Sequence, residues 1–359
     1  MKMGIAWNKL ARLPLIVLAV FILEAGDCRC GEILQVAAVG DIMTGNTFPE
    51  PFLPPDDGRG LFDAVKGAWS DSDIVFGNLE GPMIDGGISA KCEGRTNCYA
   101  FRMPTRYAAH LAGAGFTALG IINNHSYDFG PEGMASTLAS LRAAGISPVG
   151  GRDTATRIVK GKRIALVGFA YPTPSTMESR YFHSVTDIPK AKKVVSGLAR
   201  ENDIVIVSFH GGAEGRSARR VPKKPEIFLE EERGDVHAFA HAVIDAGADL
   251  VVGHGPHVLR AVELYKDRLI AYSLGNFLTY GWFNIKGVNG ITVVLKAGLD
   301  PKTGAFVSGQ LVSVKQVDRG LARMDPENAG AAIIRELSAS DFPGSGLVIQ
   351  PDGTITTKK

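Results

Sequence analysis

Short apolar runs rich in β-branched residues alternate along the chain with segments in which apolar residues recur at helical spacing. The runs predict strands at residues 33–39, 74–77, 118–122, 163–169, 204–209, 250–253, 269–273, 291–295 and 306–314. The segments between them predict helices at residues 60–68, 105–114, 131–144, 188–201 and 236–246. Strands that alternate with helices of this length indicate βαβ units, so the pattern predicts an α/β domain built on a sheet.

The pattern changes towards the C-terminal end. Residues 291–314 predict two consecutive strands around the turn Asp300-Pro-Lys-Thr-Gly304, a hairpin that finishes the sheet. After about Met324 the chain is rich in Ala, Ser, Gly and Pro, with one short predicted helix at 329–337 and a last dozen residues expected to be frayed. The simplest division of the chain is a signal segment, one domain and a C-terminal extension, at residues 1–30, 31–325 and 326–359.

The N-terminus has the composition of an export signal. Lys2, Lys9 and Arg12 give it a positive charge, and an apolar run of eleven residues follows at 13–23. A membrane-spanning helix needs roughly 20 apolar residues, whereas the apolar region of a signal peptide has about 7–15. We therefore predict an exported protein, periplasmic or extracellular, with a cleaved signal; an uncleaved N-terminal membrane anchor is the alternative.

Charge and cysteine usage limit the possible partners. Lys and Arg number 39 against 37 Asp and Glu, so the composition gives no sign of the concentrated basic face that nucleic-acid binding needs. The basic segment 216–224 contains Arg219 and Arg220 and predicts a track for an anionic polymer, with a solvated loop as the alternative. Cys92 and Cys98 enclose a turn-rich stretch and predict a small disulfide loop, in agreement with export, and the four cysteines fit no zinc-finger spacing.

Potential metal ligands follow five of the predicted strands. They are Asp41 after the first strand, Asn78 and Glu80 after the second, Asn124 and His125 after the third, His210 after the fifth, and His254 and His257 after the sixth. The carboxyl ends of the strands in an α/β sheet form the crevice in which ligands bind, so these side chains are expected to converge. Carboxylate, amide and imidazole donors suit Mn, Zn, Fe or Mg. For each residue alone, a structural role is the alternative: a hydrogen-bonded histidine, a capping aspartate or a loop amide.

These residues belong to six blocks of sequence. The blocks are Gly40-Asp41-Ile-Met43, Gly77-Asn78-Leu-Glu80-Gly81-Pro82, Asn123-Asn124-His125-Ser-Tyr-Asp128-Phe-Gly130, His210-Gly-Gly-Ala-Glu214, Gly253-His254-Gly-Pro-His257-Val and Ser273-Leu-Gly275-Asn276-Phe277. In this order they resemble the CapA family of bacterial poly-γ-glutamate capsule synthesis proteins. The resemblance implies a calcineurin-like metallophosphoesterase fold, an α/β sandwich of mixed β-sheets flanked by helices around a site for one or two divalent metal ions.

The resemblance also implies roles for single residues. It assigns metal binding to Asp41, Asn78, Glu80, Asn124, His210, His254 and His257, and the role of the catalytic histidine to His125. Asn78 or Glu80 falls in the block that normally supplies a metal-bridging Asp, and Met43 stands where the phosphoesterases carry a second ligand His. We expect substrate contacts from Glu214, Asn276, Arg219 and Arg220.

Three functions follow as hypotheses. The first is metal-assisted hydrolysis in the synthesis of poly-γ-glutamate or a related anionic envelope polymer. The second is a non-catalytic, metal-stabilised scaffold that docks the polymer or a membrane synthase complex. The third is an exported nucleotidase or phosphoesterase that acts on a small phosphorylated substrate, because the same fold serves that chemistry too.

Overall fold

The computed structural model describes residues 1, 3, 32–89, 91, 98–150, 154–171, 182–281 and 283–358. The chain divides into two compact units, Met1–Cys30 and Gly31–Lys359, and nearly all of the described residues fall in the second. The predicted export signal and Cys92 lie outside the described residues, so the signal and the Cys92–Cys98 disulfide stay predictions. Within the described ranges, no helix is long and apolar enough to cross a membrane.

The second unit contains a sheet of ten strands. Eight of them follow the order β17 (Leu347–Ile349), β18 (Thr354–Thr357), β15 (Phe306–Val317), β14 (Ile291–Leu299), β1 (Leu34–Met43), β2 (Ile74–Leu79), β3 (Ala118–Gly120) and β4 (Ser147–Val149). In addition, β13 (Asn276–Thr279) pairs with β1, and β16 (Leu321–Met324) pairs with β15. The central strand β1 runs parallel to β2 and β13 and antiparallel to β14, so the sheet is mixed.

A second sheet has six strands. Its order is β11 (Val262–Tyr265), β12 (Arg268–Ala271), β10 (Leu250–His254), β7 (Ile204–His210), β6 (Lys162–Ala170) and β5 (Ala155–Val159). The inner strands β12, β10, β7 and β6 are mutually parallel, and the two edge strands are antiparallel to their neighbours. A separate hairpin joins β8 (Glu226–Phe228) to β9 (Glu231–Gly234).

The two sheets pack face to face. Val36 and Ala38 of β1 belong to the same buried apolar cluster as Ile206 of β7 and Val252 of β10. Successive side chains of a strand point to opposite faces, so the intervening Ala37 joins a different cluster on the outer face of β1. Burial on both faces explains why the central strands are continuous apolar runs.

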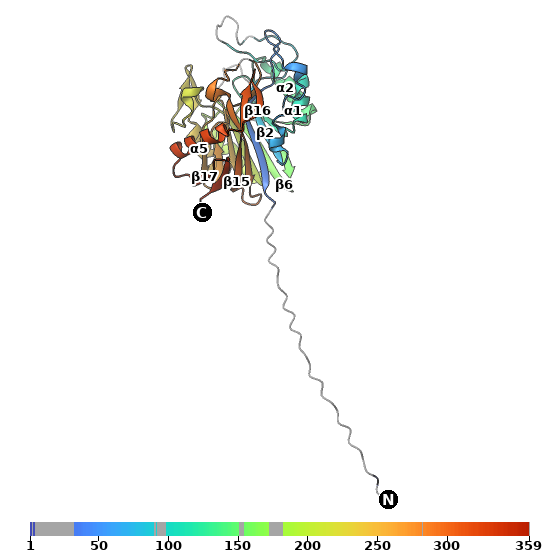
Figure 1. Ribbon diagram of the computed structural model, residues 1–359, viewed down its shortest axis with the longest axis vertical. Coiled ribbons are helices and arrows are strands. Elements are labelled where there is room, and N and C mark those ends of the chain that lie inside the picture. Colours follow the sequence, from blue (N-terminus) through green and yellow to red (C-terminus); the bar gives the residue numbers. More distant parts are fainter. Residues whose placement is uncertain are drawn as a thin grey trace. The chain divides into compact units, whose positions relative to one another are not determined.

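Helices cover the outer faces of the sandwich. Against the ten-stranded sheet lie α1 (Ala108–Gly113) and α2 (Gly130–Ala143), and against the six-stranded sheet lie α3 (Ile188–Glu201) and α4 (Val236–Asp245). The helix α5 (Ala329–Asp341) contacts β14, β15 and β11, and Figure 1 shows it on the flank away from α1 and α2. Aspartates begin α3 and α4 by accepting hydrogen bonds from backbone amides of the first turn.

The predicted α/β sandwich of mixed sheets flanked by helices is confirmed. Every predicted strand is present, and β14 and β15 form the predicted hairpin. The predicted helix at 60–68 is wrong, since this stretch forms turns and then a short 3-10 helix, Lys66–Trp69. Gly60 and Gly67 disfavour the helix, and Leu61, Phe62 and Val65 are buried without it.

The expected frayed end is also wrong. Strands β17 and β18 pair with each other, and β18 pairs with β15 at the edge of the ten-stranded sheet. Ile355 of β18 is buried in the cluster between the sheets. The composition of this segment gave no clue to that pairing, because the partner strand lies more than forty residues earlier in the chain.

Candidate metal centre

Strands of both sheets end side by side at one edge of the sandwich. Asp41 of β1 is the register partner of Asn78 on β2 and of Asn276 on β13. In the other sheet, His254 of β10 is the register partner of His210 on β7. Asp41, Asn78, His210 and His254 lie at or near the carboxyl ends of their strands, and Asn276 lies beside Asp41 as the first residue of β13. The structure therefore brings together side chains that are up to 235 residues apart in the sequence, Asp41 and Asn276 being the most distant.

Asp41 is fully buried at the centre of the group. Its backbone N–H donates to the carbonyl of Gly275, 2.9 Å away. A Cβ at the preceding Gly40 would lie 1.9 Å from the same carbonyl oxygen, so only glycine lets β1 approach β13 this closely. The carboxylate faces two imidazoles: Oδ1 lies 3.5 Å from His254 Nδ1, and Oδ2 lies 3.1 Å from His257 Nδ1.

His257 reaches Asp41 from an unusual backbone conformation. Its φ is +56°, in the left-handed region that non-glycine residues rarely adopt. Nδ1 also lies 2.9 Å from Asn276 Oδ1, and Nε2 lies 3.9 Å from Glu214 Oε2. Strained residues of this kind concentrate at functional sites, where the surrounding contacts hold them in place.

Asn78 connects the two buried carboxylates. Its amide nitrogen donates to Asp41 Oδ1 at 2.8 Å and to Glu80 Oε2, and its amide oxygen accepts from Asn123 Nδ2 at 3.1 Å. The oxygen of Asn78 therefore points away from the carboxylates, towards Asn123. Of the two residues predicted to replace the bridging Asp, Glu80 is the one that presents an oxygen to the cluster.

Several buried atoms of this group make no hydrogen bond to any described residue. They are Glu80 Oε1, Asn124 Oδ1, His210 Nε2 and both ring nitrogens of His254. Ligand atoms of Asp41, Glu80 and His210 lie within 4.8 Å of one another. Buried polar atoms in native proteins are nearly always satisfied, so their concentration at one point indicates a bound group. The carboxylate of Glu80 and the imidazoles of His210 and His254 have free ligand atoms, and the carboxylate of Asp41 lies beside them. This donor set suits a divalent metal ion, so the residues fit the metal that the sequence predicted.

The charges of the group are strongly coupled. Burial opposes ionisation of Asp41, but the imidazoles of His254 and His257 outweigh it and hold the pKa of Asp41 far below its usual range. Burial and the charge of Asp41 raise the pKa of Glu80 well above its ordinary value. Burial alone would lower the pKa of His257, but Asp41 and Glu214 raise it to about 10. A divalent cation would reverse this balance, because its charge allows both carboxylates to ionise and displaces the proton of an imidazole.

A second set of polar residues lies around His125. Its Nδ1 is 2.8 Å from Asp128 Oδ2 and 3.0 Å from Lys91 Nζ, and Lys91 forms an ion pair with Asp128. The ring packs against Phe101, with centroids 4.1 Å apart. Burial and the neighbouring Lys91 lower the pKa of His125. These contacts fix one ring nitrogen and leave Nε2 for another partner.

A cavity of about 550 Å³ opens beside both groups. Its lining includes polar and apolar side chains: Lys91, Phe101, Asn124, His125, Glu214, Phe228, Arg233, His257, Asn276 and Phe283. Arg233 forms ion pairs with Glu214 and Glu231, and its guanidinium lies 4.0 Å from the Tyr171 ring centroid. Its Nε is buried without a hydrogen bond to any described residue. Sequence reasoning missed Arg233 because it lies in a hairpin, not at the end of a predicted strand.

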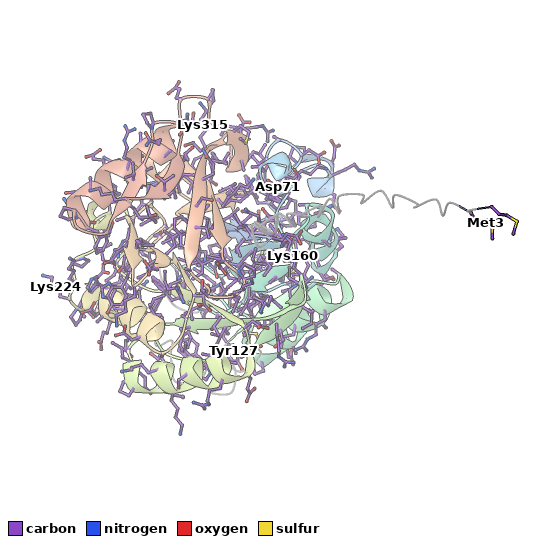
Figure 2. All side chains as sticks on the ribbon, turned by 90° about the horizontal axis from the view of Figure 1, so that it is seen from below. Met3, Asp71, Tyr127, Lys160, Lys224 and Lys315 are labelled. Carbon is purple, nitrogen blue, oxygen red and sulfur yellow. The ribbon has the colours of Figure 1, made fainter. Side chains whose placement is uncertain are left out.

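The structure brings most of the predicted site together, with one exception. Glu214 and Asn276 line the cavity as expected of substrate-binding residues. Arg219 and Arg220 lie elsewhere: Arg220 pairs with Asp341 of α5, and Figure 2 shows Lys224 of the same basic segment at the periphery of the domain. Within the described residues, the Arg and Lys side chains that line the cavity are Arg233 and Lys91 instead. A role for Arg219 and Arg220 in polymer binding stays a prediction.

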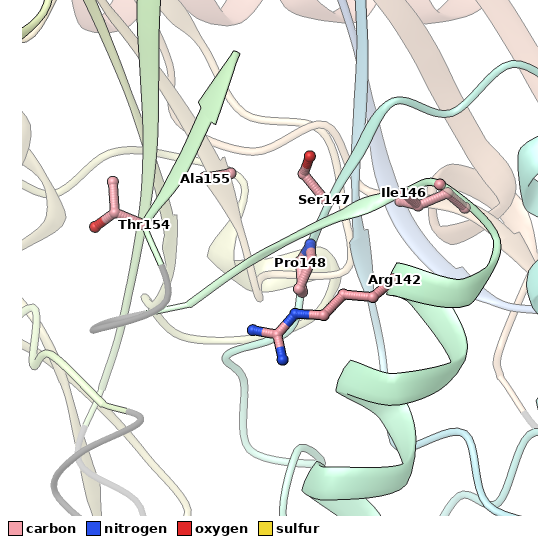
Figure 3. Close-up of a pocket in the computed structure, with 7 residues that line it drawn as sticks. Arg142, Ile146, Ser147, Pro148, Thr154 and Ala155 are labelled. Atoms are coloured by element: carbon pink, nitrogen blue, oxygen red, sulfur yellow. The ribbon is translucent and has the colours of Figure 1, made fainter.

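Another hollow lies between α2 and the strands β4 and β5 (Figure 3). It has a volume of about 330 Å³ and is lined by Arg142, Gly145, Ile146, Ser147, Pro148, Thr154 and Ala155. None of these seven described residues carries a carboxylate or an imidazole. The hollow therefore lacks the donors of a metal centre, and the strand ends remain the candidate site.

Comparison with known proteins agrees with this geometry. The family model described as bacterial capsule synthesis protein PGA_cap matches residues 35–280. The chain belongs to this family. The PGA_cap match contains every clustered side chain, from Asp41 to Asn276, and ends before β14. The CapA resemblance predicted from the six sequence blocks is confirmed.

Two curated proteins with similar sequences are capsule or PGA biosynthesis proteins. Capsule biosynthesis protein CapA of Bacillus anthracis is 32% identical over 278 residues, which cover 72% of this chain and 63% of the relative. PGA biosynthesis protein CapA of Bacillus subtilis is 29% identical over 268 residues, 70% of this chain and 65% of the relative. The chain therefore spans slightly less than two thirds of the length of these relatives.

Solved structures are similar in outline. The calcineurin-like phosphoesterase YfkN from Bacillus subtilis has a TM-score of 0.40 and 12% sequence identity, covering 81% of this chain and 88% of that chain. At this score the likeness concerns the layered fold alone and carries nothing about the site.

Proposed function

We propose that this protein acts outside the cytoplasm in the synthesis of poly-γ-glutamate or a related anionic envelope polymer, through a metal-dependent hydrolase cleft. The observation that carries the proposal is the set of buried ligand atoms on Glu80, His210 and His254 that have no hydrogen bond to any described residue. A cavity with cations on its wall lies next to them. The names of the curated relatives, which refer to capsule and PGA biosynthesis, support the polymer.

Asp41, Glu80, His210 and His254 would hold the ion, with Asn124 Oδ1 as a further donor. When bound, a divalent metal supplies a Lewis acid and lowers the pKa of a coordinated water towards about 7. Asn78 keeps the carboxylates of Asp41 and Glu80 close together through the two hydrogen bonds of its amide nitrogen. This arrangement prepares the ligands before the ion arrives.

His125 is the residue that would protonate the leaving group or steady the charge that develops on it. Asp128 and Lys91 hold its Nδ1, so Nε2 is available to a substrate in the cavity. Proton transfer by a positioned side chain typically contributes about 10²–10⁴-fold to the rate. Phe101 limits the motion of the ring from one side.

Arg233 and Lys91 would bind the carboxylates of the polymer. Arg233 has an unpaired Nε and lies against Tyr171, so its position is fixed before the substrate binds. Phe228 and Phe283 line the same cavity and would pack against the methylene groups of glutamyl side chains. A cavity with cations and aromatic walls suits a substrate that alternates charge with aliphatic carbon.

The test combines elemental analysis with an activity panel. The purified full chain is analysed for bound divalent metal and then assayed with added Mn²⁺ or Zn²⁺ on γ-glutamyl polymers, phosphodiesters and phosphomonoesters. We expect stoichiometric metal, cleavage of the γ-glutamyl polymer, and loss of turnover in His125→Ala with the metal retained. His110→Ala, a variant of a half-buried histidine on α1 outside the strand-end cluster, serves as the control. Absence of stoichiometric metal together with unchanged function in His210→Ala would end the proposal.

One observation favours a non-catalytic scaffold as the second candidate. Met43, at the position where the phosphoesterases carry a second ligand His, is fully buried in the apolar cluster below the outer face of β1. It leaves one metal position without that donor. A scaffold predicts metal binding and polymer binding but no turnover on any member of the panel, whereas cleavage of phosphate esters alone would identify a phosphoesterase.

A further inference from the structure

A second group of metal-ligand side chains lies on α4, apart from the strand-end cluster. His237 and His241 are four residues apart, so they project from the same face of the helix. Val236, Phe239, Ala240 and Val243 bury the adjoining face against the six-stranded sheet. The two imidazoles are left half-buried at the border of this packing, where both can be reached from solvent.

The third member of the group comes from the edge strand β11. The Glu263 side chain is about 90% buried, and its Oε2 lies 2.9 Å from His241 Nε2. Tyr272 donates a hydrogen bond of 2.6 Å to the same oxygen. Ligand atoms of His237, His241 and Glu263 all lie within 4.8 Å of one another. A carboxylate oriented by a second hydrogen bond is the arrangement that metal sites use to fix their ligands.

A purely structural role accounts for part of this group. The His241–Glu263 contact and the stacking of His241 on Tyr265, with centroids 3.7 Å apart, are sufficient to pack α4 on β11. The His237 ring lies 4.1 Å from that of His241 and stacks on the rings of Phe342 and Tyr272, with centroids 5.9 and 6.3 Å away. Stacking uses the faces of this ring, whereas a metal ion would bind a nitrogen at its edge.

We propose that His237, His241 and Glu263 bind a divalent transition-metal ion, with Zn²⁺ as the ion to test. Two imidazoles and one carboxylate are a donor set that zinc uses, with water at the fourth position. The three ligands come from two separate elements, so the ion ties α4 to the edge strand of the six-stranded sheet. This site is independent of the proposed function, since it shares no residue with the strand-end cluster.

The experiment counts zinc in the full chain. Metal-free protein is incubated with Zn²⁺, freed of excess by gel filtration, and analysed for metal per chain. The double variant His237→Gln/His241→Gln should hold one equivalent less than the wild type. His210→Ala should keep that equivalent while losing zinc from the strand ends, and His110→Gln should match the wild type.

Zn²⁺ affinity and melting temperature give a second test of the proposed site on α4. In the His210→Ala background, Zn²⁺ should raise the melting temperature, and Glu263→Gln, which keeps the shape of the side chain, should weaken Zn²⁺ binding at least about 100-fold. Circular dichroism of each metal-free variant checks that it folds. The proposal is overturned if the double variant binds as much zinc as the wild type, or if Glu263→Gln binds it equally tightly.

Discussion

Two buried groups of charged side chains lie on neighbouring segments of this protein and differ in one respect. Arg260 is fully buried, and its guanidinium donates to both oxygens of Glu226 and to the carbonyls of Ala213 and Ala218. The strand-end cluster is equally buried, but Glu80, His210 and His254 keep ligand atoms with no hydrogen bond to a described residue. Burial of charge therefore does not mark a functional site by itself. Several unsatisfied ligand atoms gathered at one point do, because buried polar groups in a fold are nearly always paired and a bound group would satisfy them together.

The largest expected effect is on stability and concerns the buried ion pair of Arg260 and Glu226. Arg260→Met leaves Glu226 buried without its partner and should lower the free energy of unfolding by about 3–5 kcal/mol. Adding Glu226→Leu should recover most of the loss, since apolar side chains of similar volume replace a buried ion pair at little cost. Urea unfolding of both variants measures this. A double variant as unstable as the single one would contradict a purely structural role for the pair.

The next effect concerns the unsatisfied cluster. Asp41→Asn keeps the shape of the side chain but removes the charge that faces His254 and His257. Metal affinity should fall at least about 100-fold, because even the loss of a residue that only orients a ligand costs about 10–100-fold. Titration calorimetry with Zn²⁺ or Mn²⁺ measures the change, with His110→Ala as control. Equal affinity in wild type and variant would remove Asp41 from the ligand set.

The coupling of His257 to Asp41 should make the stability of the metal-free protein depend on pH. The pKa of His257 is raised from 6.5 to about 10, mainly by Asp41 and Glu214 against the opposing effect of burial. A raised folded-state pKa stabilises the protein fully below 6.5, and this stabilisation is lost as the pH rises towards about 10. The free energy of unfolding should therefore fall over that range in the wild type and less in Asp41→Asn. Parallel pH profiles for the two proteins would contradict the coupling.

The smallest expected effect is a gain in stability of the metal-free protein when Glu80 is replaced. Glu80 is buried beside the charge of Asp41, and both burial and this charge raise its pKa. Glu80→Gln removes the group that the metal-free fold holds unfavourably, so it should stabilise the metal-free protein at pH 7 by about 0.5–1 kcal/mol while weakening metal binding. Stability gained at the expense of ligand binding is typical of functional residues. Destabilisation of the metal-free variant would show that Glu80 is structural.

Much of this fold could be predicted because its central strands are buried on both faces. Continuous apolar runs such as 204–209 and 250–253 predicted β7 and β10 to within a residue. The helix at 60–68 failed because apolar spacing alone cannot separate a helix from a turn that buries the same side chains. The strands β17 and β18 failed because their stability comes from a distant neighbour, β15, and not from their own composition.

The sequence by itself determined which residue types stand at the ends of the strands, and with them the chemistry of the candidate centre. Local sequence encodes where a buried strand stops, and polar residues placed there meet at one edge of a sheet. Only the tertiary structure decided that Glu80 rather than Asn78 presents its oxygen, that Arg233 supplies a cation, and that Glu263 meets two histidines of α4. Side-chain orientation and contacts between distant segments depend on the register and packing of the whole sandwich, which no local stretch of the chain contains.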